Sequence, residues 1–146
     1  MIVKNGNPIL TNPCDAVTRD NYSKYLNRFL LRSIPHRKNG IGISANQVNL
    51  PYRICSIRSD DYWQTLINPK ITRFYGKKIV NLEGCLSITG KQFNVERDIK
   101  IDVTYRDVGF NKATVIYTYL KAIVVQHELD HLNGILISSK GTEHIE

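Results

Sequence analysis

The segment VVQHELDHLNG, residues 124–134, contains two histidines four positions apart, with a glutamate directly after the first. Residues at this spacing lie on one face of a helix, so His127 and His131 can bind one metal ion together. With the adjacent Glu128, the pair matches a known helical metal-binding motif. Hydrolytic sites of the zinc type use three protein ligands and one water, so the motif predicts a third ligand elsewhere in the chain.

A single histidine on an apolar helix face is more often a satisfied core residue than a ligand. Here the helical stripe that contains both histidines also contains Leu120, Ile123 and Val124, and it is predicted to be buried. Burying two imidazoles without partners would cost about 1–3 kcal/mol each. The pair, its spacing and the neighbouring glutamate therefore favour a metal site.

Candidates for the third ligand lie on both sides of the motif. One hydrolase class extends it to HExxHxxGxxH, and this chain follows the extension to Gly134 but has Ile137 in place of the third histidine. Another class uses a later glutamate, and only Glu143 and Glu146 remain, in a terminal segment that we expect to fray. The upstream candidates are Cys14, Cys55, Cys85 and His36.

Cys85 is favoured among these because of its context, NLEGCLSITG at residues 81–90. It follows a glycine at the end of an apolar run, where the sulfur and the neighbouring amides can face one spot. Cys55 alternates like a strand residue and is predicted to be a small core hydrophobe, while Cys14 is predicted to be structural or idle. A thiolate with two imidazoles and an open position is a known catalytic coordination, for which zinc is expected.

The elements that must position these residues follow from hydrophobic periodicity. Apolar residues recur at helical spacing between Asp15 and Ser33, and Pro35 closes the pattern. Residues 40–116 contain short apolar or alternating runs separated by Gly, Asn, Asp and Pro, which predict a series of strands. A second helix is expected from about Tyr117 to Leu132, with Gly134 as its stop signal. The order predicts an α+β fold with the second helix packed on a sheet.

Length and composition predict one globular domain, residues 1–146, with 42% hydrophobic and 23% charged residues. Three cysteines cannot all pair within the chain, and MIVKNGNPIL contains no signal peptide, so we expect free or metal-bound thiols in a reducing compartment. No apolar run approaches the roughly 18 residues of a membrane span. We therefore expect a soluble, intracellular protein rather than a membrane protein or a disulfide-stabilised secreted one.

The formal net charge of +7 and the pI of about 9.4 are compatible with acidic partners such as nucleic acid or a ribosome surface. The lysines and arginines are spread along the sequence, and the densest cluster is His36-Arg37-Lys38. No nucleic-acid-binding motif accompanies them. We therefore expect a solvated basic surface rather than a sequence-specific nucleic-acid site.

Three segments, in this order, resemble the three motifs of the peptide deformylase family: GIGISANQ (residues 40–47), EGCLS (83–87) and QHELDH (126–131). ILTNP at residues 9–13 and VER at 95–97 also resemble the family, so the similarity spans nearly the whole chain. It implies antiparallel strands packed around an HExxH helix. It also implies an enzyme that removes the formyl group from N-formylmethionine on nascent polypeptides.

By this resemblance, one divalent metal ion is bound by Cys85, His127 and His131. The family implies ferrous iron in vivo, with zinc, nickel or cobalt as substitutes in purified protein. Such an ion lowers the pKa of its water and supplies a hydroxide. Glu128 is then implied to take the proton of the water and deliver it to the leaving amine.

The resemblance also implies the groups that bind the substrate. The side-chain amide of Gln47 and the backbone N–H of Leu86 would stabilise the oxyanion, whereas without the family pattern Gln47 is better interpreted as a capped loop amide. Ile41 and Gly42 would pair with the peptide as an added strand. The methionine pocket is implied to contain Gly84, Ile123, Val124 and part of His127.

Further positions support or depart from the family pattern. Glu83 and Arg97 resemble an ion pair beneath the site, joined by Asp130. Ser44 replaces a usual alanine, and Asn49 stands where glycine is common, in a turn that asparagine tolerates.

Only 15 residues follow His131, so the chain resembles the short, virus-encoded deformylases that lack a C-terminal helical extension. We accordingly expect the protein in the cytoplasm of a bacterium or of an infected host, and an organelle remains an alternative location. Its expected partners are formyl-methionyl nascent peptides and, as an open possibility, the ribosome surface. The alternatives are another metal-dependent amidase or peptidase with the same ligands, or a non-catalytic metal or nucleic-acid-binding module, against which Glu128 and Gln47 argue.

Overall fold

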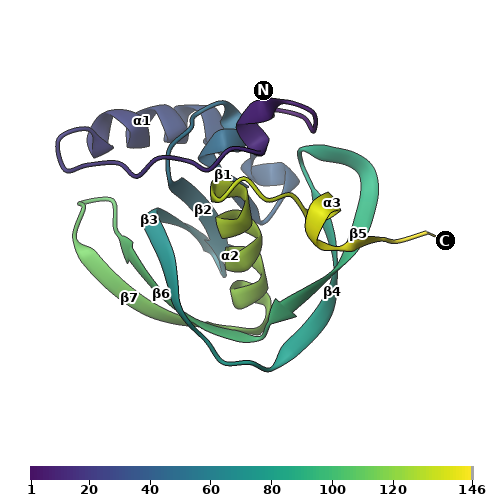
Figure 1. Ribbon diagram of the computed structural model, residues 1–146. Helices are drawn as coiled ribbons and strands as arrows, with labels where there is room; N and C mark the ends of the chain where they lie inside the picture. Colours follow the sequence, from purple (N-terminus) through teal and green to yellow (C-terminus); the bar gives the residue numbers. More distant parts are fainter. Residues whose placement is uncertain (146) are drawn as a thin grey trace.

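The computed structural model describes residues 1–145, in which two antiparallel sheets lie on either side of one central helix (Figure 1). The helices are α1 (Tyr22–Ser33), α2 (Tyr119–Leu132) and α3 (Ile137–Lys140), with 3-10 helices η1 (Pro8–Leu10), η2 (Ile34–Asn39) and η3 (Ala45–Val48). The strands are β1 (Gly42–Ser44), β2 (Ile54–Ser59), β3 (Tyr62–Phe74), β4 (Lys78–Cys85), β5 (Ile88–Asp98), β6 (Lys100–Arg106), β7 (Lys112–Thr118) and β8 (Thr142–Glu143). The predicted α+β class is confirmed.

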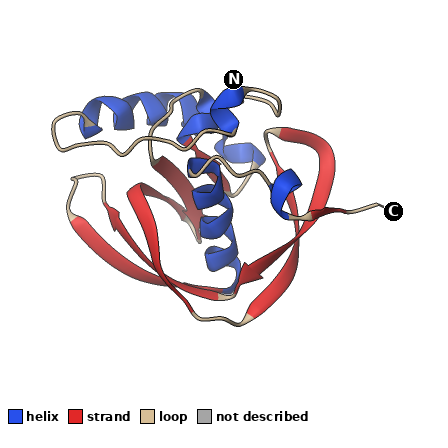
Figure 2. Cartoon of the chain, in the orientation of Figure 1, coloured by secondary structure: helices blue, strands red, loops and turns tan. Residues whose placement is uncertain are grey.

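The two sheets present neighbouring edges to α2. The five-stranded sheet has the order β1-β2-β3-β6-β7, so β1 is an edge strand. The three-stranded sheet has the order β4-β5-β8, so β4 is an edge strand as well. Helix α2 contacts β1, β2, β6 and β7 of the first sheet and β5 of the second. Figure 2 shows this helix between the strands of both sheets.

Helix α1 begins later than the periodicity predicts, because a turn precedes it. The backbone N–H of Thr18 donates to the Asn21 side chain, and the N–H of Asn21 donates to the Thr18 hydroxyl. Leu26 and Phe29 are buried against the five-stranded sheet and η3. The helix ends before Pro35, which has no N–H to continue the hydrogen bonding.

Helix α2 is buried on nearly all sides, and its packing forms the main core. Val125, Leu129 and Leu132 pack against β2, β3, β6 and β7, in a cluster that includes Cys55. Cys55 is fully buried, which confirms its predicted place in the core. The other core cysteine, Cys14, is also buried, and burial raises the pKa of its thiol to about 11. Both thiols are therefore protonated and inert at neutral pH.

The end of α2 and the terminal segment are held by backbone contacts. Gly134 has φ of +76°, and a Cβ at this position would lie 2.8 Å from the backbone carbon of Thr11, so glycine is required where the helix stops. The expectation that the terminal segment frays is wrong at residues 142–143, because this strand pairs with Phe93 and Asn94 of β5. Glu146 lies outside the described residues.

Within residues 1–145, no helix is both long enough and apolar enough to cross a membrane.

Candidate functional site

Three side chains from two elements converge between the sheets. His127 and His131 lie one turn apart on α2, and Cys85 is the last residue of β4. One potential ligand atom from each lies within 4.8 Å of the other two, and the Cys85 sulfur is 3.3 Å from Nε2 of His131. Bond lengths of about 2.0–2.3 Å around a tetrahedral ion place the donor atoms about 3.3–3.7 Å apart. The three residues therefore fit one divalent ion.

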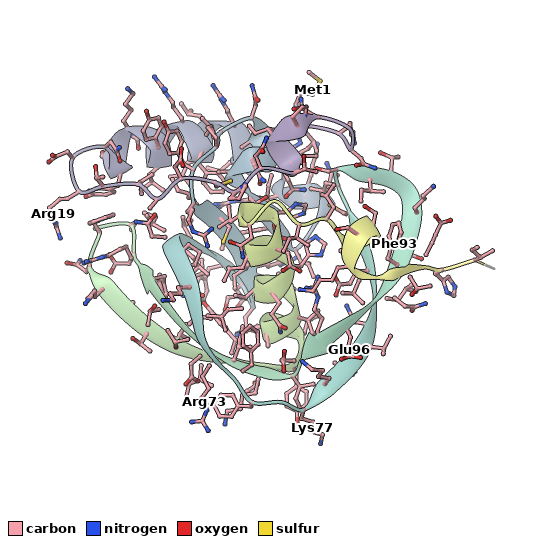
Figure 3. All side chains as sticks on the ribbon, viewed as in Figure 1. Met1, Arg19, Arg73, Lys77, Phe93 and Glu96 are labelled. Atoms are coloured by element: carbon pink, nitrogen blue, oxygen red, sulfur yellow. The ribbon has the colours of Figure 1, made fainter. Side chains whose placement is uncertain are left out.

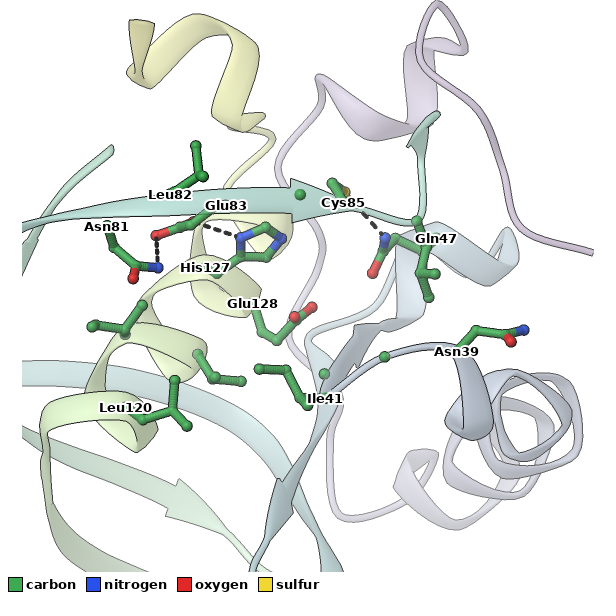
Figure 4. A pocket seen from close by; sticks show the side chains of 16 residues that line it. Asn39, Ile41, Gln47, Asn81, Leu82, Glu83, Cys85, Leu120, His127 and Glu128 are labelled. Carbon is green, nitrogen blue, oxygen red and sulfur yellow. Dashed lines mark hydrogen bonds and ion pairs between the residues drawn. The ribbon is translucent and has the colours of Figure 1, made fainter. Parts of the chain in front are cut away.

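The orientation of His127 is set by a carboxylate behind it. Nδ1 of His127 is 2.8 Å from Oε1 of Glu83, which leaves Nε2 of the ring free to face a metal (Figure 4). Histidine ligands in metal sites commonly donate their second ring N–H to a carboxylate. This hydrogen bond fixes the orientation and the tautomer of the ring. Glu83 was expected to support the site as the partner of Arg97, and its direct contact with His127 adds a second role.

Arg97 holds Glu83 in place by two charge-assisted hydrogen bonds. Its Nε and Nη2 donate to the two carboxylate oxygens at 2.9 and 2.8 Å, while Nη1 donates to Asp130. Arg97 is 1% exposed. Burial alone would raise the pKa of Glu83, but the hydrogen bonds and charges of Arg97 and His127 lower it to about 2. The carboxylate is therefore ionised at every physiological pH.

The two histidines experience opposite shifts. Burial disfavours a charge on His127, but the sulfur of Cys85 and the carboxylate of Glu83 outweigh it and raise the pKa of His127 to about 10. Burial and the nearby His127 lower the pKa of His131 well below its ordinary value. The protein groups around the site therefore favour a positive charge on His127 and disfavour one on His131.

Glu128 lies beside the three potential ligands and is not one of them. It is 3% exposed, and its Oε1 has no hydrogen-bond partner among residues 1–145. Burial raises the pKa of this carboxyl to about 7, which suits a group that accepts and returns a proton near neutral pH. A Cβ added at Gly42 would overlap the Glu128 carboxylate. Gly42 is therefore needed for this side chain, a reason that sequence analysis missed.

The side chain of Gln47 is held with its nitrogen toward the site. Its Oε1 accepts a hydrogen bond from the N–H of Ser44 at 3.0 Å, and its Nε2 donates to the Ser87 hydroxyl at 3.2 Å. The same nitrogen is 3.6 Å from the Cys85 sulfur. Gln47 thus caps η3 through its oxygen and reaches Ser87 and Cys85 through its nitrogen. Asn49 ends this turn at φ of +63°, the left-handed conformation expected for it.

A cavity of about 470 Å³ opens in front of these groups. All five residues expected to bind substrate line it, together with further residues to which sequence analysis gave no substrate role: Asn39, Asn81, Leu82 and Leu120. Leu120 precedes Val124 by one helical turn, so the periodicity of α2 contains the signal for it. Leu86 lines the same cavity beside Cys85. The wall is mainly apolar, and its polar side chains include Gln47, Glu83, His127 and Glu128.

The N-terminal segment ties together the two loops beside the cavity, which no motif predicted. The N–H of Val3 donates to the carbonyl of Gln47, and the N–H of Asn5 donates to the carbonyl of Ser87, both at 2.8 Å. Nζ of Lys4 donates to the carbonyl of Leu86, also at 2.8 Å. The spacing of Gln47 and Leu86 therefore depends on residues far from both in the sequence.

Comparison with known proteins adds independent information. A family model described as polypeptide deformylase matches residues 1–144. A peptide deformylase of Flavobacterium psychrophilum is 32% identical, over 97% of this chain and 81% of the relative. A Met-Ala-Ser-bound structure of the class I type b enzyme from Acinetobacter baumannii superposes with a TM-score of 0.88 at 27% identity, covering 96% of each chain. The enzyme of the Vibrio parahaemolyticus bacteriophage VP16T, in complex with actinonin, superposes with a TM-score of 0.85 at 33% identity, covering 93% of this chain and 98% of the other.

Proposed function

The chain belongs to the peptide deformylase family and is an enzyme that removes the formyl group from nascent polypeptides, and we propose which of its residues carry out that reaction. The observation that carries the proposal is the convergence of Cys85, His127 and His131 on one point beside a buried carboxylate. These three residues would hold one divalent ion. Ferrous iron is the proposed ion in vivo, with zinc, nickel or cobalt as substitutes.

The chemistry begins with an activated water. A bound divalent ion supplies Lewis-acid activation, which makes a water nucleophilic near neutral pH. Glu128 takes the proton of this water, because its carboxylate is buried beside the potential ligands and has an unpartnered oxygen. It then returns the proton to the amine nitrogen as the bond to the formyl carbon breaks. This transfer leaves formate and a free amino terminus.

Charge that develops on the formyl oxygen needs fixed donors. Nε2 of Gln47 is proposed as one donor, since the hydrogen bond from Ser44 to the amide oxygen turns the nitrogen toward Cys85. The backbone N–H of Leu86, next to the proposed sulfur ligand, is proposed as the second. Donors that are held before the reaction cost no reorganisation when charge appears.

The peptide is proposed to lie between the open edges of the two sheets. Gly42 on β1 and Ile41 before it offer backbone groups from one side, and Gly84 on β4 lies on the other. A peptide in this position adds a strand to an exposed edge. The methionine side chain would enter the apolar part of the cavity at Ile123 and Val124. The Met-Ala-Ser complex of the related Acinetobacter enzyme supports a peptide of this kind as the ligand.

The proposed partners are formyl-methionyl nascent chains, which the enzyme would encounter at the ribosome surface. The cytoplasm of a bacterium, or of a host infected by a virus, is the proposed location. The remaining alternative, another metal-dependent amidase or peptidase, uses the same ligands but a different acyl group. It is distinguished by substrate rather than by the metal site.

One assay tests the proposed site and its substrate together. Protein purified without oxygen and analysed for metal is incubated with formyl-Met-Ala-Ser, acetyl-Met-Ala-Ser and unblocked Met-Ala-Ser. We expect about one divalent ion per chain, release of formate from the first peptide and no turnover of the other two. Activity should fade in air as iron and the Cys85 thiolate oxidise. Full activity in a thoroughly metal-stripped sample would contradict the proposal, as would faster cleavage of the acetylated peptide.

A further inference from the structure

The net positive charge of this chain arises in one segment, which contains cations and no acidic residues. Residues 21–59 contain no Asp or Glu and seven cations: Lys24, Arg28, Arg32, Arg37, Lys38, Arg53 and Arg58. The whole chain has 20 Lys and Arg against 13 Asp and Glu, so the remaining residues carry 13 of each sign. The entire net charge of +7 therefore comes from this segment. The segment contains α1, and the residues that follow this helix include some that line the cavity of the candidate active site.

Three of these cations form one row on α1. Lys24, Arg28 and Arg32 are spaced by four residues and are all exposed, which places them along the same side of the helix. We call this row the basic stripe. Side chains along the outer side of α1 end in nitrogen and project into solvent (Figure 3). The row presents successive positive charges about 6 Å apart along the helix axis.

The basic stripe is unfavourable for the isolated helix. Like charges four residues apart repel one another. Lys24 also lies in the first turn, where the helix dipole disfavours a cation, and this turn contains no acidic residue. None of the three forms an ion pair within residues 1–145; Arg32 donates only to the backbone carbonyls of Val48 and Asn49. An external anion would relieve this repulsion.

The stripe is connected to the candidate active site by η2. This 3-10 helix follows α1 directly and carries Arg37 and Lys38, while the next two residues, Asn39 and Gly40, line the substrate cavity. Arg37 stacks over the ring of Trp63, with its guanidinium carbon 5.0 Å from the ring centroid. An anionic surface bound along α1 would therefore lie beside the side of the enzyme that receives the peptide.

We propose that the basic stripe of α1 is a docking surface for the phosphate backbone of structured RNA. Arg and Lys side chains on one helix face supply the sequence-independent contacts that bind phosphates. A helix that lies on a membrane instead buries a broad apolar face among lipids, but Leu26 and Phe29 of α1 are buried in the protein core. The exposed large apolar side chains of α1 and η2 are Leu31 and Ile34, next to the exposed Pro35. The inference rests on the proposed function, because an enzyme that acts on nascent chains meets them at the ribosome surface, which is rich in RNA.

Binding to a fluorescein-labelled RNA hairpin of about 20 base pairs, measured by anisotropy between 50 and 200 mM KCl, tests the proposal. The variant Lys24→Gln/Arg28→Gln removes two contacts and leaves the hydrogen bonds of Arg32 intact. The slope of log K against log salt should fall by about two, with a loss of affinity on the order of 10- to 100-fold at 0.1 M salt. The matched control Lys77→Gln/Lys112→Gln removes the same charge from exposed lysines elsewhere, one in the loop before β4 and one at the start of β7. The control should bind within about threefold of the parent.

Parallel measurements separate the possible outcomes. Turnover of free formyl-Met-Ala-Ser should be unchanged in both variants, so failure of RNA docking is distinguishable from failure of the proposed catalytic site. Equal losses in both variants would overturn the proposal, because total charge alone would then explain binding. Tighter binding to phosphatidylserine vesicles or to polyglutamate than to the hairpin would also overturn it. Thermal melting of each variant confirms that any loss of binding is not a loss of fold.

Discussion

Replacing Arg97 by methionine should destabilise the fold and loosen the metal site at the same time. Methionine is apolar and of similar length, so the Arg97→Met variant leaves the carboxylates of Glu83 and Asp130 without their shared guanidinium. Arg97 is 1% exposed, and Glu83 is 6% exposed. Removing one partner of a buried ion pair costs about 3–5 kcal/mol, because the remaining charge is left without a counter-charge.

The pKa of Glu83 provides a second estimate of the same quantity. A fall from an ordinary value of 4.5 to about 2 corresponds to about 3 kcal/mol of stability at neutral pH, of which the contact with His127 supplies a part. Because the folded-state pKa is the lower one, this contribution is complete above pH 4.5 and is lost as the pH falls toward 2. The difference in stability between parent and variant should therefore shrink over that interval.

Urea unfolding in the presence of a chelator, at pH 7 and at pH 3, measures the loss without interference from metal. Competition with a chromogenic chelator then measures metal affinity, which should fall about 10- to 100-fold as Glu83 ceases to hold His127. The control Arg73→Met removes an exposed arginine that stacks on Tyr75 with no ion pair in the described residues, and it should change stability by less than about 1 kcal/mol. A loss below 1 kcal/mol in Arg97→Met, together with unchanged metal affinity, would refute this account of the buried network.

Four further substitutions test single residues of the site, and Cys55→Ala serves as a control in the core. Cys85→Ala should lose metal and activity together, whereas Cys55→Ala should retain both, as metal analysis will show. Glu128→Ala should keep the ion and lose about 10²–10⁴ in turnover; loss of metal would mean that this carboxylate is a ligand. Gln47→Ala should reduce kcat about 10²–10³-fold with KM within several-fold, and parental kinetics would reduce this amide to a loop cap. Gly42→Ala should keep metal but lower kcat on the order of tenfold or more, because the new Cβ displaces Glu128.

Local features of this protein could be predicted from sequence because they depend on neighbours in the chain. The spacing of His127 and His131 places both on one face of any helix that contains them, so their proximity could be predicted without knowledge of the fold. Asn49 was expected to adopt a left-handed conformation, and it does so at φ of +63°. The row of Lys24, Arg28 and Arg32 could be predicted in the same way, because residues four apart lie on the same side of a predicted helix. It was nevertheless interpreted only as scattered surface charge.

The tertiary structure decided which distant residues meet. From residue types alone, Cys14, Cys55, Cys85 and His36 were all candidate ligands. The local context of Cys85 favoured it, and the resemblance to a family then implied the same residue. The position of the three-stranded sheet beside α2 brings Cys85 to His131, while Cys55 is buried in the core against the other sheet. The direction of the Gln47 amide depends on Ser44 and Ser87, and the loop that holds Ser87 is tied down by the N-terminal segment. Such contacts depend on sheet register and packing, and the hydrophobic pattern of a single element contains no information about either.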